Sequence, residues 1–123
     1  MTFAAAELRE LAEHWVAAWN MHDLDAILSH YSDDVQFQAM TVAARFNRPD
    51  GKLHGVAELR EHFRRGLEKV PGLRFELEEV FSAPGGYAVV YRRENGNRVI
   101  DAVELDGDGK VRRATAYYLT EQK

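Results

Sequence analysis

The stretch RVIDAVEL, residues 98–105, places one acidic side chain among aliphatic ones. If it forms a strand, alternation puts Asp101 on the same face as Val99, Val103 and Leu105. Turn-forming residues flank the stretch, ENGN before it and DGDGK after it, so the strand is expected inside a sheet. A buried carboxylate is costly unless it is neutralised or paired. Asp101 is therefore the first candidate catalytic residue, and the alternative is a structural aspartate paired with an arginine or a backbone N–H.

His54 is the second candidate catalytic residue, because it lies just before a predicted helix and histidine exchanges protons near neutral pH. The alternative for His54 is an exposed loop position. His14 and His62 follow Glu10 and Glu58 by four residues, which predicts exposed pairs on helix surfaces. No histidine or acid cluster has the spacing of a metal site, so we expect neither a metal nor a cofactor.

Length and composition exclude several classes of protein. The chain has 123 residues, which predicts a single domain spanning 1–123 with its own hydrophobic core. It has no cysteine, which excludes disulfides and thiol catalysis. A net charge of −4 argues against a nucleic-acid surface, and no apolar run is long enough to cross a membrane. We expect a cytoplasmic protein that binds neither nucleic acid nor membrane.

Helices are predicted in the first half of the chain. Apolar residues at three- and four-residue spacing predict one helix from Leu8 to Trp19 and another from Val56 to Val70. A short helix carrying Tyr31 should follow the N-cap Asp23, and VQFQAM alternates like a strand. Within the segment 41–54, RFNRPDGK (45–52) is expected to be a turn or loop, and the pattern predicts no conformation for the rest.

The second half alternates like an antiparallel sheet. LRFELEEV, YAVVYRR, RVIDAVEL and VRRATAYYL are the four predicted strands, and turn residues separate them. Helices, one strand, a helix and then a meander of four strands indicate the α+β class. The predicted architecture is a curved antiparallel sheet with three helices from the N-terminal half packed on one face.

This order of elements resembles the nuclear transport factor 2-like superfamily, in particular its SnoaL-like polyketide cyclase and ketosteroid isomerase branches. The stretches HWVAAWNMHDLDAILSHYSDDVQF, HGVAELREHF and DGDGKVRRATAYY carry the resemblance, which covers nearly the whole chain. It implies a cone-shaped, cystatin-like α+β barrel around an apolar pocket that the helices close. It also implies a homodimer formed through the outer face of the sheet.

The resemblance also implies roles for three residues. Trp15 lies where the isomerases carry a hydrogen-bonding tyrosine, and its indole N–H is a donor in a different place. Asp101 lies where they carry a protonated aspartate of the oxyanion hole. Ala39 lies where they carry the proton-moving aspartate, so the usual isomerase mechanism is not expected. SnoaL-like cyclases use a pocket aspartate, and Asp101 is the residue available for that role.

Strand alternation and the resemblance together predict the residues that line a substrate-binding pocket. These are Trp15, Trp19, Tyr31, Phe37, Ala39, Phe63, Tyr87, Val89, Tyr91, Val103, Ala114, Ala116 and Tyr118. The alternative is that their aromatic rings simply fill a small core.

Two functions follow as hypotheses. The first is an enzyme that binds a small lipophilic or carbonyl-containing molecule and isomerises, cyclises or dehydrates it, with Asp101 as acid, base or oxyanion donor. The second is a non-catalytic ligand-binding or dimerisation module of the same fold.

Overall fold

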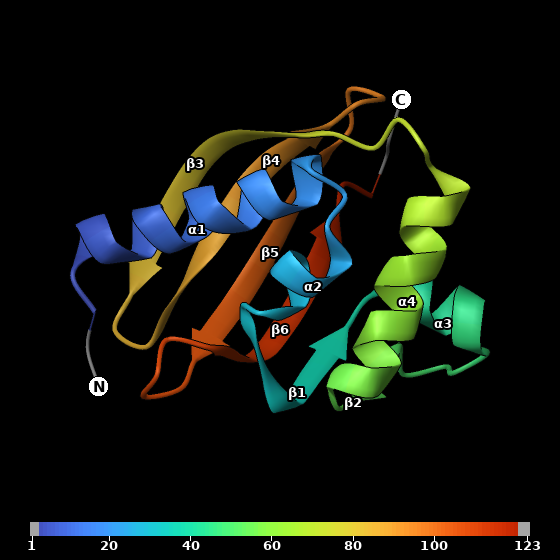
Figure 1. The fold of residues 1–123 in the computed structure, drawn as a ribbon, viewed down its shortest axis with the longest axis horizontal. Helices are drawn as coiled ribbons and strands as arrows, with labels where there is room; N and C mark the ends of the chain where they lie inside the picture. The colour runs from blue at the N-terminus through green and yellow to red at the C-terminus, as the bar shows by residue number, and fades with distance from the viewer. Residues whose placement is uncertain (1–2, 121–123) are drawn as a thin grey trace.

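The computed structural model describes residues 3–120. This part of the chain contains four helices and six strands (Figure 1). In chain order they are α1 (Ala5–Asn20), α2 (Leu24–Leu28), β1 (Tyr31–Gln38), α3 (Met40–Phe46), β2 (Lys52–His54), α4 (Val56–Lys69), β3 (Phe75–Ala83), β4 (Gly86–Arg93), β5 (Arg98–Leu105) and β6 (Val111–Tyr118).

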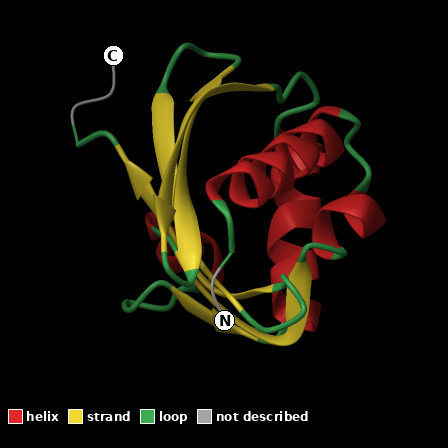
Figure 2. Ribbon diagram, turned by 90° about the vertical axis from the view of Figure 1, so that its left-hand side faces the viewer, coloured by secondary structure: helices red, strands yellow, loops and turns green. Residues whose placement is uncertain are grey.

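The strands form one curved sheet in the order β2-β1-β6-β5-β4-β3. Neighbouring strands are antiparallel except β1 and β6, which run parallel. Figure 2 shows the sheet bending around the helices, and α1, α2 and α4 lie on its concave side. The α+β class and the curved sheet are confirmed, whereas a wholly antiparallel sheet was wrong at the β1–β6 pair.

Short-range interactions explain where the helices begin. The side chain of Asp23 accepts a hydrogen bond from the N–H of Ala26 at 3.1 Å, so it caps α2 as predicted. Gly55 precedes α4 with a φ of 91°, a value that favours glycine.

The helix α1 packs against β3 and buries Leu8, Trp15 and Trp19. The apolar stripe of α1 therefore faces the core, as its spacing indicates.

The segment 41–54 forms a helix and a strand around a turn, and the predicted loop 45–52 is shorter than expected because its two ends belong to these elements. Met40–Phe46 forms α3, which ends at Asn47 in the left-handed conformation with a φ of 53°. Lys52–His54 forms β2, which pairs with β1. The turn between them brings Gly51 so close to Ala39 that a Cβ on Gly51 would lie 2.6 Å from the Ala39 carbonyl oxygen. A backbone approach of this kind is a long-range contact that local sequence does not reveal.

The second helix is also shorter than predicted. Tyr31 begins β1 and does not belong to the helix, because α2 ends at Leu28 and Ser29 is its C-cap. Its ring still points into the core, where Tyr31 is 5% exposed.

The strand that carries Asp101 lies inside the sheet, between β4 and β6. Asp101 faces Val89 on β4 and Ala116 on β6, and it shares the buried face with Val99. Ile100 points to the outer face and is 40% exposed. The predicted alternation of β5 is confirmed, so the fold places the Asp101 carboxyl group on the inner face of the sheet.

Candidate functional site

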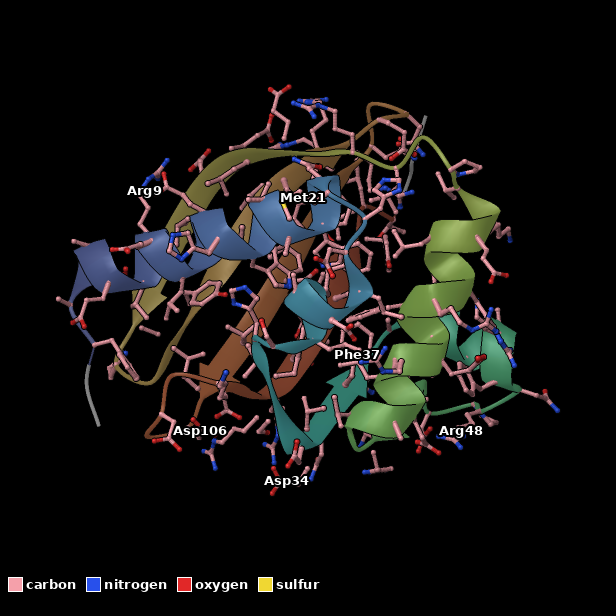
Figure 3. The ribbon with its side chains drawn as sticks, viewed as in Figure 1. Arg9, Met21, Asp34, Phe37, Arg48 and Asp106 are labelled. Carbon is pink, nitrogen blue, oxygen red and sulfur yellow. The ribbon has the colours of Figure 1, made fainter. Side chains whose placement is uncertain are left out.

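A small pocket lies between the concave face of the sheet and the helices. Its volume is about 120 Å³. It is lined by Trp15, Trp19, Phe37, Thr41, Arg45, His62, Phe63, Gly66, Val70, Leu73, Phe75, Tyr91, Arg93, Asp101, Ala116 and Tyr118. Figure 3 shows one of these residues, Phe37, inside the molecule between β1 and α4, whereas Arg9, Asp34 and Arg48 lie at its periphery.

Asp101 provides the acidic group of this pocket. The residue is only 4% exposed, and its Oδ1 accepts a hydrogen bond from the Tyr91 hydroxyl at 3.1 Å. Burial raises the pKa of Asp101 to about 7, and the bond from Tyr91 opposes this rise only in part. No arginine, lysine or histidine forms an ion pair with Asp101 within residues 3–120. The carboxyl group is therefore protonated in a large fraction of molecules at neutral pH and can donate a hydrogen bond.

Aromatic rings pack around the Asp101–Tyr91 pair, and both residues are buried. The Tyr91 ring lies 4.3 Å from Phe75 and 5.5 Å from Trp15, measured between centroids. Trp19 makes an edge contact with Phe63 at 4.7 Å. Such packing buries the carboxyl group, and burial is the physical cause of its raised pKa.

Trp15 does not present its N–H to the pocket. The indole Nε1 donates a hydrogen bond to the Tyr31 hydroxyl at 2.9 Å, and both residues are buried. Trp15 is thus a donor, as expected, but its N–H is bonded to Tyr31. By contrast, the buried Nε1 of Trp19 has no acceptor in the part of the chain that the structure describes.

A polar cluster from α3 and α4 forms another wall of the pocket. Arg45 Nη1 lies 3.1 Å from His62 Nδ1 and donates to the His62 carbonyl oxygen at 2.9 Å. Because a guanidinium only donates, Nδ1 of His62 accepts and Nε2 carries the proton. That Nε2 lies 3.5 Å from the Thr41 hydroxyl.

His62 is buried, being only 5% exposed. Burial and the charges of Arg45 and Arg65 lower the pKa of His62 to about 4, so the ring is neutral at neutral pH. The predicted surface pair of His62 with Glu58 was wrong, since Glu58 instead binds Arg48 through two hydrogen bonds of 2.8 Å. The pair of His14 with Glu10 is exposed as expected, at 4.0 Å.

The structure brings only part of the predicted set together. Eight predicted residues line the pocket: Trp15, Trp19, Phe37, Phe63, Tyr91, Asp101, Ala116 and Tyr118. Six others lie outside it and contribute to the core or its edge: Tyr31, Ala39, Tyr87, Val89, Val103 and Ala114. Ala39 caps α3 and borders a separate surface depression, because the chain turns away from the sheet there.

His54 lies away from the pocket. It is exposed at the end of β2, and its backbone N–H donates to the Glu58 carboxylate at 2.9 Å. The geometry thus gives His54 no contact with the Asp101 pocket, and the exposed alternative describes its position.

Several pocket residues were missed from the sequence: Thr41, Arg45, His62, Gly66, Val70, Leu73, Phe75 and Arg93. His62 follows Leu59 by three residues and precedes the buried Phe63, so the apolar spacing of α4 was the signal that could have located it. Thr41 and Arg45 were not recognisable because no helix was predicted at Met40–Phe46.

Residues 3–120 contain no group of three or more histidine, aspartate and glutamate side chains arranged to hold a metal ion. Within the same residues, no helix has the length and apolar character needed to cross a bilayer.

Comparison with solved structures identifies similar folds. A SnoaL-like protein of unknown function from Burkholderia thailandensis E264 is 29% identical, with a TM-score of 0.92 over 97% of this chain and 99% of that one. A protein with a cystatin-like fold from Methylobium petroleophilum PM1 is 17% identical, with a TM-score of 0.77 over 100% of this chain and 82% of that one. An NTF2-like protein from Cytophaga hutchinsonii ATCC 33406 is 16% identical, with a TM-score of 0.68 over 91% and 89%.

A search of curated proteins finds no match. The model of the SnoaL-like domain family matches residues 12–118, which include the pocket and nearly all of the fold. The resemblance inferred from the sequence is thereby confirmed, and the chain belongs to the SnoaL-like domain family of the NTF2-like superfamily.

Proposed function

We propose that this protein binds a small carbonyl-bearing molecule in the Asp101 pocket and that the protonated Asp101 carboxyl donates a hydrogen bond or a proton to it. The observation that supports this most directly is the buried carboxyl group itself. It has a pKa near 7, one hydrogen bond from Tyr91, and a place on the pocket wall. A neutral carboxylic acid in an apolar site is a good donor to a carbonyl oxygen.

The size of the pocket restricts the ligand. A volume of about 120 Å³ is below the range of roughly 300–1,000 Å³ that drug-sized ligands occupy. It is close to that of a cavity of about 150 Å³ that admits benzene. We therefore propose a ligand about the size of one six-membered ring, rather than the polycyclic substrates that the resemblance would suggest.

The pocket supports acid chemistry better than two-residue proton shuttling. Asp101 is the acid on its wall, and Ala39 supplies no second carboxyl. His62 holds its only exchangeable ring proton on Nε2 and accepts from Arg45 at Nδ1, so it is a donor and not a base in this arrangement. Proton donation to a carbonyl oxygen, as in isomerisation, cyclisation or dehydration, fits this set of groups.

Titration with cyclohexanone tests the proposal. Both tryptophans of the chain line the pocket, so their fluorescence should report binding. Affinity should fall as the pH rises through about 7, because ionised Asp101 can no longer donate. Asp101→Asn keeps a neutral donor at every pH, so its affinity should not change with pH. Binding by the wild type that is independent of pH, or absent, would contradict the proposal.

A non-catalytic binding module is the second candidate. The buried Tyr91–Asp101 hydrogen bond favours it, because a pair of this kind can serve a structural role alone. The two candidates differ in the effect of Asp101→Asn on turnover of a substrate found by screening ring ketones. An enzyme should lose turnover while ligand affinity is largely retained, whereas a binding module should show no turnover in either form.

We also infer a homodimer through the outer face of the sheet, and a cytoplasmic location. The dimer is supported by Phe81, Ile100 and Tyr117, which expose 56%, 40% and 57% of their surface on that face. Analytical ultracentrifugation should give twice the 14.0 kDa chain mass, and Ile100→Lys should shift the species to the monomer. A monomeric wild type at micromolar concentration would contradict the dimer, and cell fractionation tests the location.

A further inference from the structure

Arg45 carries a positive charge on the pocket wall that no acidic side chain neutralises in residues 3–120. Arg93, the other arginine of the pocket, differs because it forms an ion pair with Glu94 at 3.0 Å and lies over the Phe75 ring. We propose that the ligand of this pocket carries a carboxylate and that Arg45 binds it. This inference rests on the proposed function and names the chemical class of its ligand.

The donor geometry of Arg45 leaves room for such a group. A guanidinium has five N–H donors, and Nη1 uses its own on the carbonyl oxygen and Nδ1 of His62. The donors on Nε and Nη2 have no acceptor among the described residues. Because His62 fixes one end of the guanidinium, the remaining donors are held in place for a planar acceptor such as a carboxylate.

The surroundings of Arg45 favour an anion over a neutral group. Arg45 is half-buried, and burial together with the nearby charge of Arg65 lowers its pKa, which signals a cation without a counter-charge. His62 is neutral and its Nε2–H donates to the Thr41 oxygen, so the Thr41 hydroxyl can donate its own proton to the ligand. A carboxylate would supply the missing negative charge and accept from Arg45 and from the Thr41 hydroxyl.

Gly66 keeps this wall open. It lies within α4, where glycine costs about 1 kcal/mol relative to alanine. A Cβ at Gly66 would lie 3.7 Å from Arg45 Nη1, which is ordinary contact, and a longer side chain would cover the guanidinium. The small residue therefore preserves access to the charge at a cost to the helix.

The pocket has two polar parts, one at Arg45 and one at Asp101, and each would bind a different end of the ligand. Arg45 takes the carboxylate, the aromatic walls take an apolar body of about one ring, and Asp101 faces the reactive or polar atom. An anion in the pocket also favours the neutral form of Asp101, since a like charge disfavours ionisation. A small keto acid or unsaturated acid has this combination of groups.

Benzoate and benzamide are matched probes for the charge, because they share size and shape and differ in the carboxylate. The wild type should bind benzoate at least about tenfold more tightly than benzamide, as expected for a charge-assisted bidentate contact. Arg45→Met should abolish this preference. Arg60→Met is the matched control. Arg60 lies on α4, but it forms an ion pair with Asp25 at 2.6 Å and does not line the pocket, so this variant should retain the preference for benzoate.

Arg45→Gln is a second variant that should keep the protein folded. Its amide can still donate to the His62 carbonyl oxygen, but it carries no charge. A folded Arg45→Gln protein, verified by thermal unfolding, should also bind both probes equally. Equal binding of the two probes by the wild type would overturn the carboxylate inference and leave the proposed function standing. Preference that persists in folded Arg45→Gln would remove Arg45 from the site. Failure of the wild type to bind either probe would overturn both proposals.

Discussion

The substitution Asp101→Asn should stabilise the folded protein at alkaline pH and leave its stability nearly unchanged in acid. Asparagine has the shape of the protonated carboxyl group and can accept the Tyr91 hydrogen bond, but it never ionises. The wild type, in contrast, must either hold a proton on Asp101 or bury a charge.

The sign and size of this effect on the free energy of unfolding follow from the shift in the pKa of Asp101. Asp101 has a pKa of about 7 in the folded protein against an ordinary value of 3.8, so between these values the folded state binds a proton that the unfolded chain has lost. This contribution to the free energy of unfolding is therefore greatest below pH 3.8, falls as the pH rises, and levels off above about 7. At 1.36 kcal/mol per pH unit, the full loss is about 4 kcal/mol.

Guanidinium unfolding at about pH 4.5 and about pH 8.5, followed by tryptophan fluorescence, measures this effect. The difference in unfolding free energy between the variant and the wild type should grow by about 3 kcal/mol between the two conditions, because part of the loss is already complete at the lower pH. Titration of all other groups cancels in the comparison of the two proteins.

Glu104→Gln is the matched control, since Glu104 lies on the same strand but points to the outer face and is exposed. Its difference from the wild type should change by less than about 0.5 kcal/mol over the same range. A difference for Asp101→Asn that does not depend on pH, or that shrinks as the pH rises, would refute the reasoning about the buried carboxyl.

Two further substitutions test the packing that positions the pocket. Gly86→Ala should lower the free energy of unfolding by at least about 2 kcal/mol, because its Cβ would lie only 1.9 Å from the Val103 carbonyl oxygen, while Gly85→Ala, with no atom within 4 Å, should change it by less than about 0.5 kcal/mol. Equal effects in urea unfolding would contradict this. Trp15→Phe should cost about 2–4 kcal/mol, since it removes the donor to Tyr31 and leaves a cavity. A double-mutant cycle with Tyr31→Phe should give a coupling of about 1 kcal/mol, and strict additivity would show that the hydrogen bond contributes nothing.

The sequence was most informative where one element was regular and amphipathic. Alternation in β5 was enough to place Asp101 on the inner face, and the helical spacing of α1 placed Trp15 and Trp19 beside it. These predictions depend only on the period of a strand or helix, and the burial of each face follows from that period.

The polar wall of the pocket required contacts between distant segments. The side chain of Arg45 on α3 reaches His62 on α4, and α3 is followed by a proline and a glycine that indicate a loop. His62 stands four residues after Glu58, a spacing that suggests a surface pair. Glu58 instead accepts two hydrogen bonds from Arg48. This contact depends on the conformation of the turn after α3, which the local sequence does not reveal.

The pocket's apolar extent was overestimated for a similar reason. Tyr87, Val89, Val103 and Ala114 share the inner face of the sheet with Asp101, but helices cover that face unevenly. Alternation predicts which face a residue occupies, whereas the position of the helices above it decides whether the space is filled. That position depends on packing of the whole core.

Carbon-13 NMR of the aspartate side-chain carboxyl groups measures the central claim most directly. The resonance of the Asp101 carboxyl carbon, assigned by its absence in Asp101→Asn, should titrate with a midpoint near 7 in the free protein. A midpoint at or below 3.8, the ordinary value, would mean that Asp101 is ionised at neutral pH and cannot act as the donor of this pocket.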